Sequence, residues 1–283
     1  MSFLSALLAA VVVGTWNGNW FPSHRAEHRA SPEAEAETIA SAAQMLAVGI
    51  AELDPAGTND VILCLNEIRG RNEAERLVGQ IGRKGLRVAS VSGYRARGNR
   101  HDYQQDVIAT TLPVVESRWE RWKGAAGIFP PRGYAFAAVV IDPATTANVY
   151  AVHLKADYHV KTAAERAENR AKRTVAVEQI LALEKKRRGA ASRPVIVAGD
   201  MNADCWSGQF ADERLFALLG KAGFANLLEM LPPKARATHP SKRFGDSTLD
   251  YVFCRGLHAP RRPRIVANDG LSDHFAVFGL LER

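Results

Sequence analysis

The sequence predicts an α/β domain built on mixed β-sheet. Apolar runs of strand length outnumber the segments with helical periodicity. Several of these runs follow one another without a helix between them, so a purely alternating, all-parallel sheet does not fit. No fixed-period repeat, low-complexity tract or Gly/Ser-rich linker interrupts the 283 residues. We therefore expect a single domain over residues 11–283.

The chain begins with an apolar stretch over residues 2–13. This stretch is shorter than the roughly 20 residues that a membrane-spanning helix needs, but it has the length of a signal-peptide core. Residues 1–10 are therefore interpreted as a signal-like or N-terminal apolar segment. Cytoplasmic and exported locations both stay open, and no transmembrane association is expected. A strand is predicted from Val11 to Thr15 in either case.

The other elements follow in order from periodicity and from end signals. A helix over 31–53 is indicated by Ser31-Pro32-Glu33, in which a capping serine precedes a proline in the first turn. Residues 119–122 are interpreted as an amphipathic turn packed on the domain, with base stacking by its tryptophans as the alternative. Further helices are expected at 71–84, 161–188 and 215–222, and strands at 60–68, 86–94, 106–113, 135–141, 148–154, 195–198, 248–254 and 276–280.

The predicted helix over 161–188 needs one apolar face to pack on the domain. An approximate face of this kind can be drawn along the helix through Ala164, Ala167, Ala171, Val175, Ile180 and Leu183.

Polar side chains follow apolar runs at five places along the chain. These places carry Asn17, Glu67, His153, Asp200 with Asn202, and Asp273 with His274. Because sites are commonly built at strand ends on one rim of a sheet, we expect these side chains to lie together. Asp250 starts its strand instead of ending it, as an antiparallel neighbour would.

In order and identity these residues resemble the endonuclease/exonuclease/phosphatase superfamily, the deoxyribonuclease I-like fold, whose members are metal-dependent phosphodiesterases and phosphomonoesterases. The resemblance spans Thr15 to Val277. It implies a four-layer sandwich of two packed mixed β-sheets flanked by helices. Its marks are T-W-N at 15–17, N-E at 66–67 where the family often has Gln-Glu, V-H-L at 152–154, G-D-M-N at 199–202, L-D-Y at 249–251 and S-D-H at 272–274.

The resemblance implies a bound Mg²⁺ ion, with Mn²⁺ or Ca²⁺ as alternatives. Glu67 is the first candidate ligand, and Asn17 would lie beside it to orient the ligand or a metal-bound water. Asp273 would reach the ion directly or through water. Magnesium suits phosphodiester hydrolysis because it is a hard ion that takes one or two carboxylates and keeps several waters.

The same resemblance implies the catalytic residues. Asp200 would position or deprotonate the attacking water, and Asn202 would donate to the phosphate or the transition state. These two residues would face the same side of an extended segment. His274 would act as an acid, a base or a phosphate contact. The carboxylate of Asp250 would fix its tautomer and raise its basicity.

His153 is a further catalytic candidate. Abasic-site endonucleases of this superfamily tend to carry tyrosine at this position, so the histidine argues against that branch. In the histidine branch a nearby acid or amide supports the ring, and here Gln105 or Asp106 could do so. These two residues point to opposite faces of a strand, and the choice between them stays open.

The chain is basic, with a formal net charge of +7 and a sequence pI near 9.5. This balance favours a phosphate-bearing partner. The candidate substrate contacts are Arg95, Arg97 and Gln105, and other histidines such as His239 are interpreted as structural or surface residues. Asp204 is interpreted as a solvated loop residue, with a second metal as the alternative.

The chain has three widely separated cysteines without C-x-x-C spacing. Neither a disulfide framework nor a zinc site is therefore expected.

We therefore expect a monomeric, magnesium-dependent phosphodiesterase. The first expectation is a nuclease that cleaves DNA or RNA by water attack on phosphorus. The sequence does not decide between DNA and RNA, or between an endonuclease and an exonuclease. One alternative is a phosphatase or phosphodiesterase of the same fold that acts on a small molecule or a lipid headgroup. An alternative of another class is a non-catalytic nucleic-acid-binding protein, which would not need the full set of acids and histidines.

Overall fold

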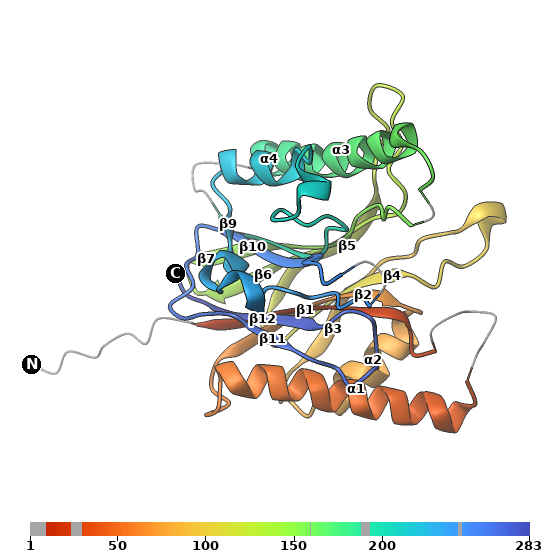
Figure 1. Cartoon of the computed structure of the whole chain (residues 1–283). Helices are drawn as coiled ribbons and strands as arrows, with labels where there is room; N and C mark the ends of the chain where they lie inside the picture. Colours follow the sequence, from red (N-terminus) through yellow and green to blue (C-terminus); the bar gives the residue numbers. More distant parts are fainter. Residues whose placement is uncertain (1–9, 24–29, 159, 188–192, 243–244) are drawn as a thin grey trace, which may run out of the picture.

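The computed structural model describes residues 10–23, 30–158, 160–187, 193–242 and 245–283, without the side chain of residue 97. In this part of the chain, two mixed β-sheets pack against each other and helices cover their outer faces (Figure 1). The predicted four-layer sandwich is confirmed. Of the apolar segment over residues 1–10, only Ala10 falls within the described residues. No helix in the described ranges is long and apolar enough to cross a membrane.

The first sheet has the strand order β11-β12-β1-β2-β4-β3. Strands β1 and β2 run parallel, and the other neighbours in the sheet are antiparallel. Helices α1 and α2 lie along its outer face (Figure 1). The elements of this half are β1 (Val11–Phe21), α1 (Pro32–Leu53), β2 (Asp60–Ile68), α2 (Arg71–Gln80), β3 (Arg87–Val91), η1 (Arg97–Asn99), β4 (Gln105–Thr110), β11 (Arg264–Val266) and β12 (Ala276–Leu281).

The second sheet has the strand order β5-β6-β7-β8-β10-β9. Strands β7 and β8 run parallel, and helices α3 and α4 lie over the outer face (Figure 1). The elements of this half are β5 (Val114–Arg121), β6 (Gly133–Asp142), β7 (Thr145–His153), α3 (Ala163–Arg187), β8 (Val195–Asp200), η2 (Gly208–Phe210), α4 (Leu215–Lys221), β9 (Ala225–Asn226), η3 (Leu227–Met230), η4 (Pro233–Ala235) and β10 (Asp250–Arg255).

Strand β1 shows how the layers form from the sequence. Val11 and Val13 belong to the core between the two sheets, whereas Val12 belongs to the core under α1 and α2. Successive side chains of a strand point to opposite faces, so a strand that is covered on both sides is apolar at every position. This explains why the run from Val11 to Val13 has no alternation.

Most predicted elements are present with ends shifted by a few residues. Helix α1 has the predicted cap, because Ser31 Oγ accepts a hydrogen bond from Ala34 N at 3.2 Å. The turn predicted at 119–122 is wrong, since residues 114–121 form the edge strand β5. Short strands β9 and β11 were not predicted.

The predicted apolar face of α3 is only partly correct. Val175 and Ile180 are buried, but Ala164 and Ala167 are exposed. Arg173 is buried in their place because it forms ion pairs with Asp157 and Glu213, which lie in the loops beside the helix. Charge pairing, which helical periodicity does not detect, therefore adds Arg173 to the inward face of this helix.

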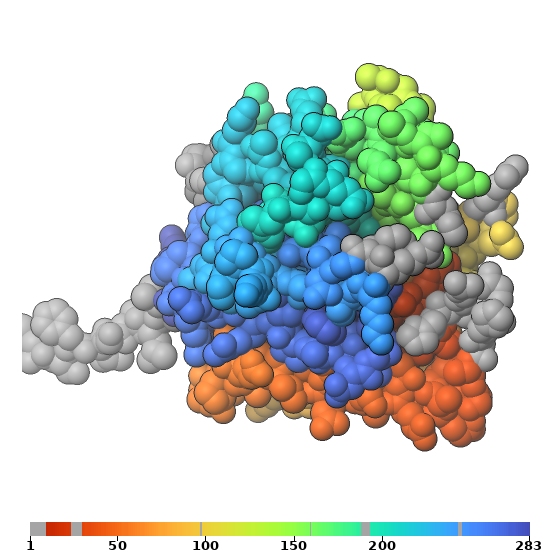
Figure 2. Space-filling view, viewed as in Figure 1, coloured from red at the N-terminus to blue at the C-terminus, as the bar shows by residue number. Residues whose placement is uncertain are grey.

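The topology brings the ends of four strands to one edge of the sandwich. In the parallel pair β1 and β2, Asn17 and Glu67 lie near the C-terminal ends of the strands, and the parallel pair β7 and β8 ends with His153 opposite Asp200. In antiparallel β10, Asp250 also lies opposite Asp200. In Figure 2 the red surface of the N-terminal strand is visible beside the blue C-terminal part of the chain.

Candidate active site

The first sheet contributes Asn17 and Glu67 through irregular backbone. A register shift interrupts β2 between Leu65 and Ile68, and Glu67 has a φ of 57° there. Such a bulge redirects a side chain, at a conformational cost of about 1–3 kcal/mol for a residue other than glycine. The Glu67 carboxylate accepts hydrogen bonds from Trp20 N at 3.1 Å and from Asn17 Nδ2 at 3.4 Å.

The second sheet contributes Asp200 and His153. Asn17 Nδ2 also donates to Asp200 Oδ2, at 2.9 Å, and so links the two sheets. His153 Nε2 lies 3.6 Å from Glu67 Oε1 and 3.5 Å from Asp200 Oδ2. All four side chains are largely buried. The strand ends that the sequence indicated therefore converge on one cluster.

A histidine–carboxylate pair borders this cluster. His274 Nδ1 lies 2.8 Å from Asp250 Oδ2, and His274 Nε2 lies 3.9 Å from Asp200 Oδ2. Thr238 Oγ1 donates to the same Asp250 oxygen at 2.8 Å. Because Nδ1 faces the carboxylate, it carries a proton, and Nε2 is the nitrogen directed toward Asp200.

The backbone around His274 is fastened to the end of β1. Ser272 Oγ donates to Asn17 O at 2.7 Å and accepts from His274 N at 3.0 Å. Trp16 Nε1 donates to His274 O at 3.1 Å. The S-D-H segment is therefore held in place by residues more than 250 positions away in the chain.

The turn after β8 orients Asn202. Asn202 N donates to Asp200 Oδ1 at 2.7 Å, and Asn202 Nδ2 donates to Leu154 O at 3.1 Å. Gly199 has a φ of 143°, and a Cβ at this position would lie 1.9 Å from Val152 O. Glycine is therefore required before Asp200 for both conformation and space.

We expect Gly199→Ala to destabilise the protein by about 3 kcal/mol or more, because the added methyl group clashes with backbone and the φ is strained. Thermal unfolding followed by circular dichroism measures the effect. Gly220→Ala is the matched control: Gly220 lies in α4 with open space at its Cβ position, and alanine should hold or slightly raise stability there. Equal melting temperatures for the two variants would contradict the assignment.

Burial controls the protonation of the cluster. Burial raises the pKa of Asp200 to about 7, although the charge of His274 opposes the shift. Burial lowers the pKa of His274, but the charges of Asp250 and Asp200 outweigh it and raise that pKa to about 10. The pKa of His153 lies well below its usual value, first because of burial and then because of the charge of Arg132.

We expect the metal-free protein to keep His274 protonated at pH 8. Its folded-state pKa lies above the ordinary value of 6.5, so the pair with Asp250 stabilises the fold fully below that pH. This stabilisation is lost as pH rises toward 10. NMR titration of ¹³C-labelled histidine measures the pKa, and Asp250→Asn should lower it. A His274 that titrates near 6.5 in the unchanged protein would refute this electrostatic account.

The acids of the cluster suit a hard divalent cation. Glu67 and Asp200 are buried, and neither forms an ion pair with a lysine or arginine in the part of the chain that the structure describes. Oxygen donors of this kind are the usual ligands of Mg²⁺. Asp273 lies on the other side of His274 Nε2, which is 3.9 Å from Asp273 Oδ1 and 3.9 Å from Asp200 Oδ2.

The structure contradicts the predicted support of His153. Asp106 accepts hydrogen bonds from Asn66 Nδ2 at 2.7 Å and from Tyr94 Oη at 2.9 Å. Gln105 is fully buried, and its side chain bonds Ser92 and Tyr94 instead of His153. His153 Nδ1 has no hydrogen-bond partner among the described residues. Asn66 joins Asp106 to the end of β8, because its Oδ1 accepts a hydrogen bond from Asp200 N at 3.1 Å.

The other predicted residues lie in varied surroundings. Arg95 is exposed, whereas the side chain of Arg97 is outside the described part of the chain. The prediction that Asp204 is solvated is wrong. Its carboxylate is buried and accepts from Trp206 N at 2.8 Å and from Thr248 N at 3.0 Å. Asp204 thus ties the turn after β8 to the start of β10.

Two residues near the site were missed by sequence reasoning. Arg132 donates to Leu154 O at 3.3 Å, the same oxygen that Asn202 Nδ2 contacts, and no described carboxylate pairs with it. The ring of His239 lies 4.8 Å from the ring of His274. A lone arginine before a strand gives no local signal. The sequence around His239 gives no signal of a site either. Its neighbour Thr238 donates a hydrogen bond to Asp250, but only the structure shows this contact.

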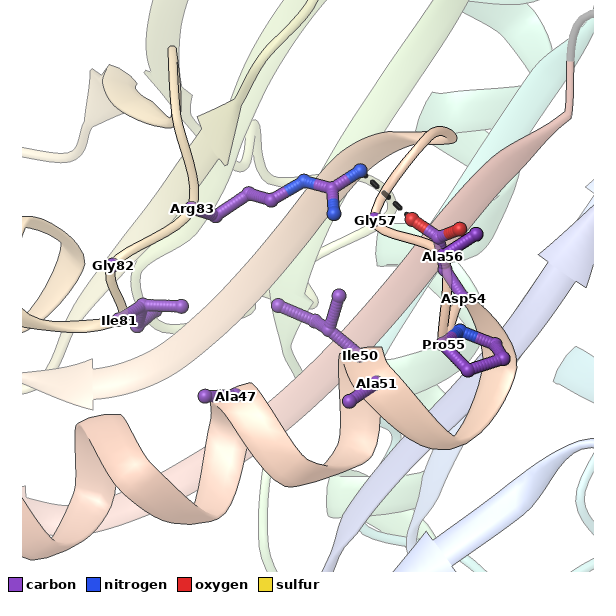
Figure 3. A pocket seen from close by; sticks show the side chains of 10 residues that line it. All are labelled: Ala47, Ile50, Ala51, Asp54, Pro55, Ala56, Gly57, Ile81, Gly82 and Arg83. Carbon is purple, nitrogen blue, oxygen red and sulfur yellow. Dashed lines mark hydrogen bonds and ion pairs between the residues drawn. The ribbon is translucent and has the colours of Figure 1, made fainter.

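A separate cavity of about 240 Å³ lies at the ends of α1 and α2 (Figure 3). It is lined by Ile50, Ile81 and an ion pair between Arg83 and Asp54 at 2.8 Å. None of the predicted site residues lines it. Because the two charges in it satisfy each other, it gives no indication of a ligand.

Comparison with known proteins gives the same architecture. A family model described as the endonuclease/exonuclease/phosphatase family matches residues 14–274. A family protein from Leptotrichia buccalis is similar with a TM-score of 0.64 and 15% identity, over 96% of this chain and 100% of that chain. One from Beutenbergia cavernae is similar with a TM-score of 0.66 and 16% identity, over 97% and 72%.

A sphingomyelinase C from Streptomyces griseocarneus is similar with a TM-score of 0.56 and 19% identity, over 95% of this chain and 98% of that chain. No match is found among curated protein sequences. At these identities the solved structures establish the fold alone.

Proposed function

The chain belongs to the endonuclease/exonuclease/phosphatase family, and from this premise we propose that it is a divalent-metal-dependent phosphodiesterase that cleaves nucleic acid. One observation carries the proposal. Asn17, Glu67, His153, Asp200 and the His274–Asp250 pair meet in one buried cluster, although they come from both sheets. A binding module has no need to bury acids such as Glu67 and Asp200 without a lysine or arginine partner, because their desolvation costs stability.

Glu67, with Asn17 beside it, is the proposed holder of Mg²⁺. When bound, the ion would supply charge stabilisation for the phosphoryl oxygens. Burial of Glu67 and Asp200 without a lysine or arginine partner supports this assignment. Asp273 has a weaker case as a ligand of the same ion, because its contacts run to His239 and His274.

The protein's own side chains are proposed to move the protons. Asp200 would hold the attacking water and accept its proton, and its high pKa suits a general base at neutral pH. His274 would present its Nε2 proton to a phosphoryl or departing oxygen, with Asp250 holding the ring. Asn202 would donate to a phosphate oxygen, since its amide group has a second N–H besides the one on Leu154 O.

Basic residues favour a polyanionic substrate. Arg95 is exposed, and Arg132 has no carboxylate partner among the described residues. Cations of this kind contact phosphates along a nucleic-acid backbone. The alternative substrate class is a lipid headgroup or another small phosphodiester, for which the likeness to a sphingomyelinase C is a reason to test.

We expect the protein to nick supercoiled plasmid in the presence of Mg²⁺ and to lose this activity with a chelator, because Glu67 and Asp200 need the cation. Gel electrophoresis measures nicking, and single-stranded DNA, RNA, sphingomyelin and a phosphomonoester panel are assayed in parallel. Turnover only of the lipid or of phosphomonoesters would overturn the nuclease proposal. Binding of DNA without turnover of any substrate would favour the non-catalytic class.

A further inference from the structure

A group of three side chains on the solvent side of His274 has an unusual donor set. His239 Nε2 lies 3.7 Å from Asp273 Oδ2, and His274 Nε2 lies 3.9 Å from Asp273 Oδ1. One ligand atom from each residue falls within 4.8 Å of the others. This set contains two imidazole nitrogens and one carboxylate, unlike the oxygen donors of Glu67 and Asn17.

We propose that His239, Asp273 and His274 form a second cation site, which binds Zn²⁺ or a related imidazole-preferring ion in preference to Mg²⁺. Imidazole nitrogens suit Zn²⁺, whereas Mg²⁺ takes oxygen ligands in an octahedral shell and retains its waters. Three protein ligands leave a fourth tetrahedral position for water or for a phosphate oxygen.

The geometry is close to what such an ion requires. Zinc bonds of about 2.1 Å place tetrahedral donors about 3.4 Å apart. The observed 3.7 and 3.9 Å run to the two different oxygens of Asp273, and with one atom taken from each residue the donors lie within 4.8 Å of one another, so they must approach by up to about 1.4 Å. Asp273 can move in this way because half of its side chain is exposed. His239 is also partly open to solvent, with 22% of its side chain exposed, so an ion has a path of entry.

The hydrogen bonding of His274 supports the same site. Histidines that bind metals usually donate their other ring N–H to a carboxylate, which fixes the ring and raises its basicity. His274 Nδ1 makes this contact with Asp250 Oδ2 at 2.8 Å. Its Nε2 has no acceptor at hydrogen-bond distance among the described residues, since both nearby carboxylate oxygens lie at 3.9 Å. No described protein acceptor therefore competes with a metal for this nitrogen, and zinc would displace the proton that it carries.

The site would couple zinc to the proposed activity. A Zn²⁺ ion on His274 Nε2 occupies the nitrogen that is proposed to present a proton to the substrate. Zinc would therefore inhibit the Mg²⁺-dependent reaction. This inhibition rests on the proposed function, whereas the binding of zinc does not.

Isothermal titration calorimetry of the metal-free full chain with Zn²⁺ alone tests the binding. We expect His239→Gln and Asp273→Asn each to weaken Zn²⁺ binding by at least about tenfold, the lower end of the loss seen when even an outer-shell partner is removed. His258→Gln is the matched control. His258 is exposed and pairs with Glu282, which follows the C-terminal end of β12, whereas His274 precedes the start of that strand. Circular dichroism melts check that each variant is folded.

Two further measurements test whether the bound ion has tetrahedral geometry and whether the site prefers it to Mg²⁺. Visible absorption of bound Co²⁺ reports a tetrahedral site, and excess Mg²⁺ should not displace the ion. Unchanged Zn²⁺ affinity in both His239→Gln and Asp273→Asn, or an equal loss in His258→Gln, would overturn the proposal. Specific Zn²⁺ binding in a protein that hydrolyses no phosphodiester would uphold the site and refute the proposed function. In an active protein, the Zn²⁺ concentration that halves each variant's own rate should rise in His239→Gln.

Discussion

Asp200→Asn is expected to lower kcat/KM for phosphodiester cleavage by about 100-fold or more. The substitution keeps the size of the side chain and its acceptor for Asn202 N, but it removes the group proposed to take a proton from water. General-base and electrostatic contributions of this size are typical of a positioned carboxylate. Steady-state kinetics on a defined oligonucleotide at saturating Mg²⁺ measure the loss.

A control variant at a second, exposed acid tests whether the loss of any one negative charge lowers the rate. Asp212→Asn removes an exposed carboxylate that pairs with Arg170, and its rate should stay within about twofold of the unchanged protein, since surface ion pairs contribute little. If Asp200→Asn retains near-normal turnover while remaining folded, Asp200 is not the base, and the proposed mechanism fails at its first step.

His274→Gln is expected to lower kcat by about 100- to 1,000-fold with a smaller effect on KM. A glutamine can still donate a hydrogen bond to Asp250, so the buried carboxylate keeps a partner and the fold should persist. It cannot carry a transferable proton on the atom that faces Asp200. Single-turnover kinetics separate the chemical step from binding.

The histidine at position 258 again provides the comparison. His258→Gln alters an exposed imidazole that lies beside Glu282 and away from the cluster, and it should leave kcat unchanged. A rise in KM with unchanged kcat, or equal losses of kcat in the two variants, would mean that His274 does not act on the reacting phosphate.

Local sequence was sufficient to predict most strands and the residues at their ends. Residues 60–68 were predicted as a strand with the observed limits, because an uninterrupted apolar run requires cover on both faces. Strand β5 was missed, because its residues are polar or exposed at most positions and it forms a sheet edge. The interior face of α3 was predicted only in part, because a buried Arg173 has no apolar signature.

The partners of the polar side chains could not be predicted. Gln105 or Asp106 was expected to support His153, but Asp106 bonds Asn66 and Tyr94, and Gln105 bonds Ser92 and Tyr94. Asp204 was expected in solvent, but it caps the turn that leads to β10. In each case several acceptors compete within a few ångströms, and the outcome depends on how the two sheets pack.

The sequence by itself determined the family, the positions of most strands along the chain and the identity of the acids, amides and histidines at their ends. These properties are encoded locally, in the change from apolar to polar residues at each strand end. Only the tertiary structure decided that Asn17 joins Glu67 to Asp200, that His153 Nδ1 lacks a described partner, and that His239 stands against His274. Such contacts join distant parts of the chain, so they are fixed by sheet packing and side-chain rotamers, which no local pattern records.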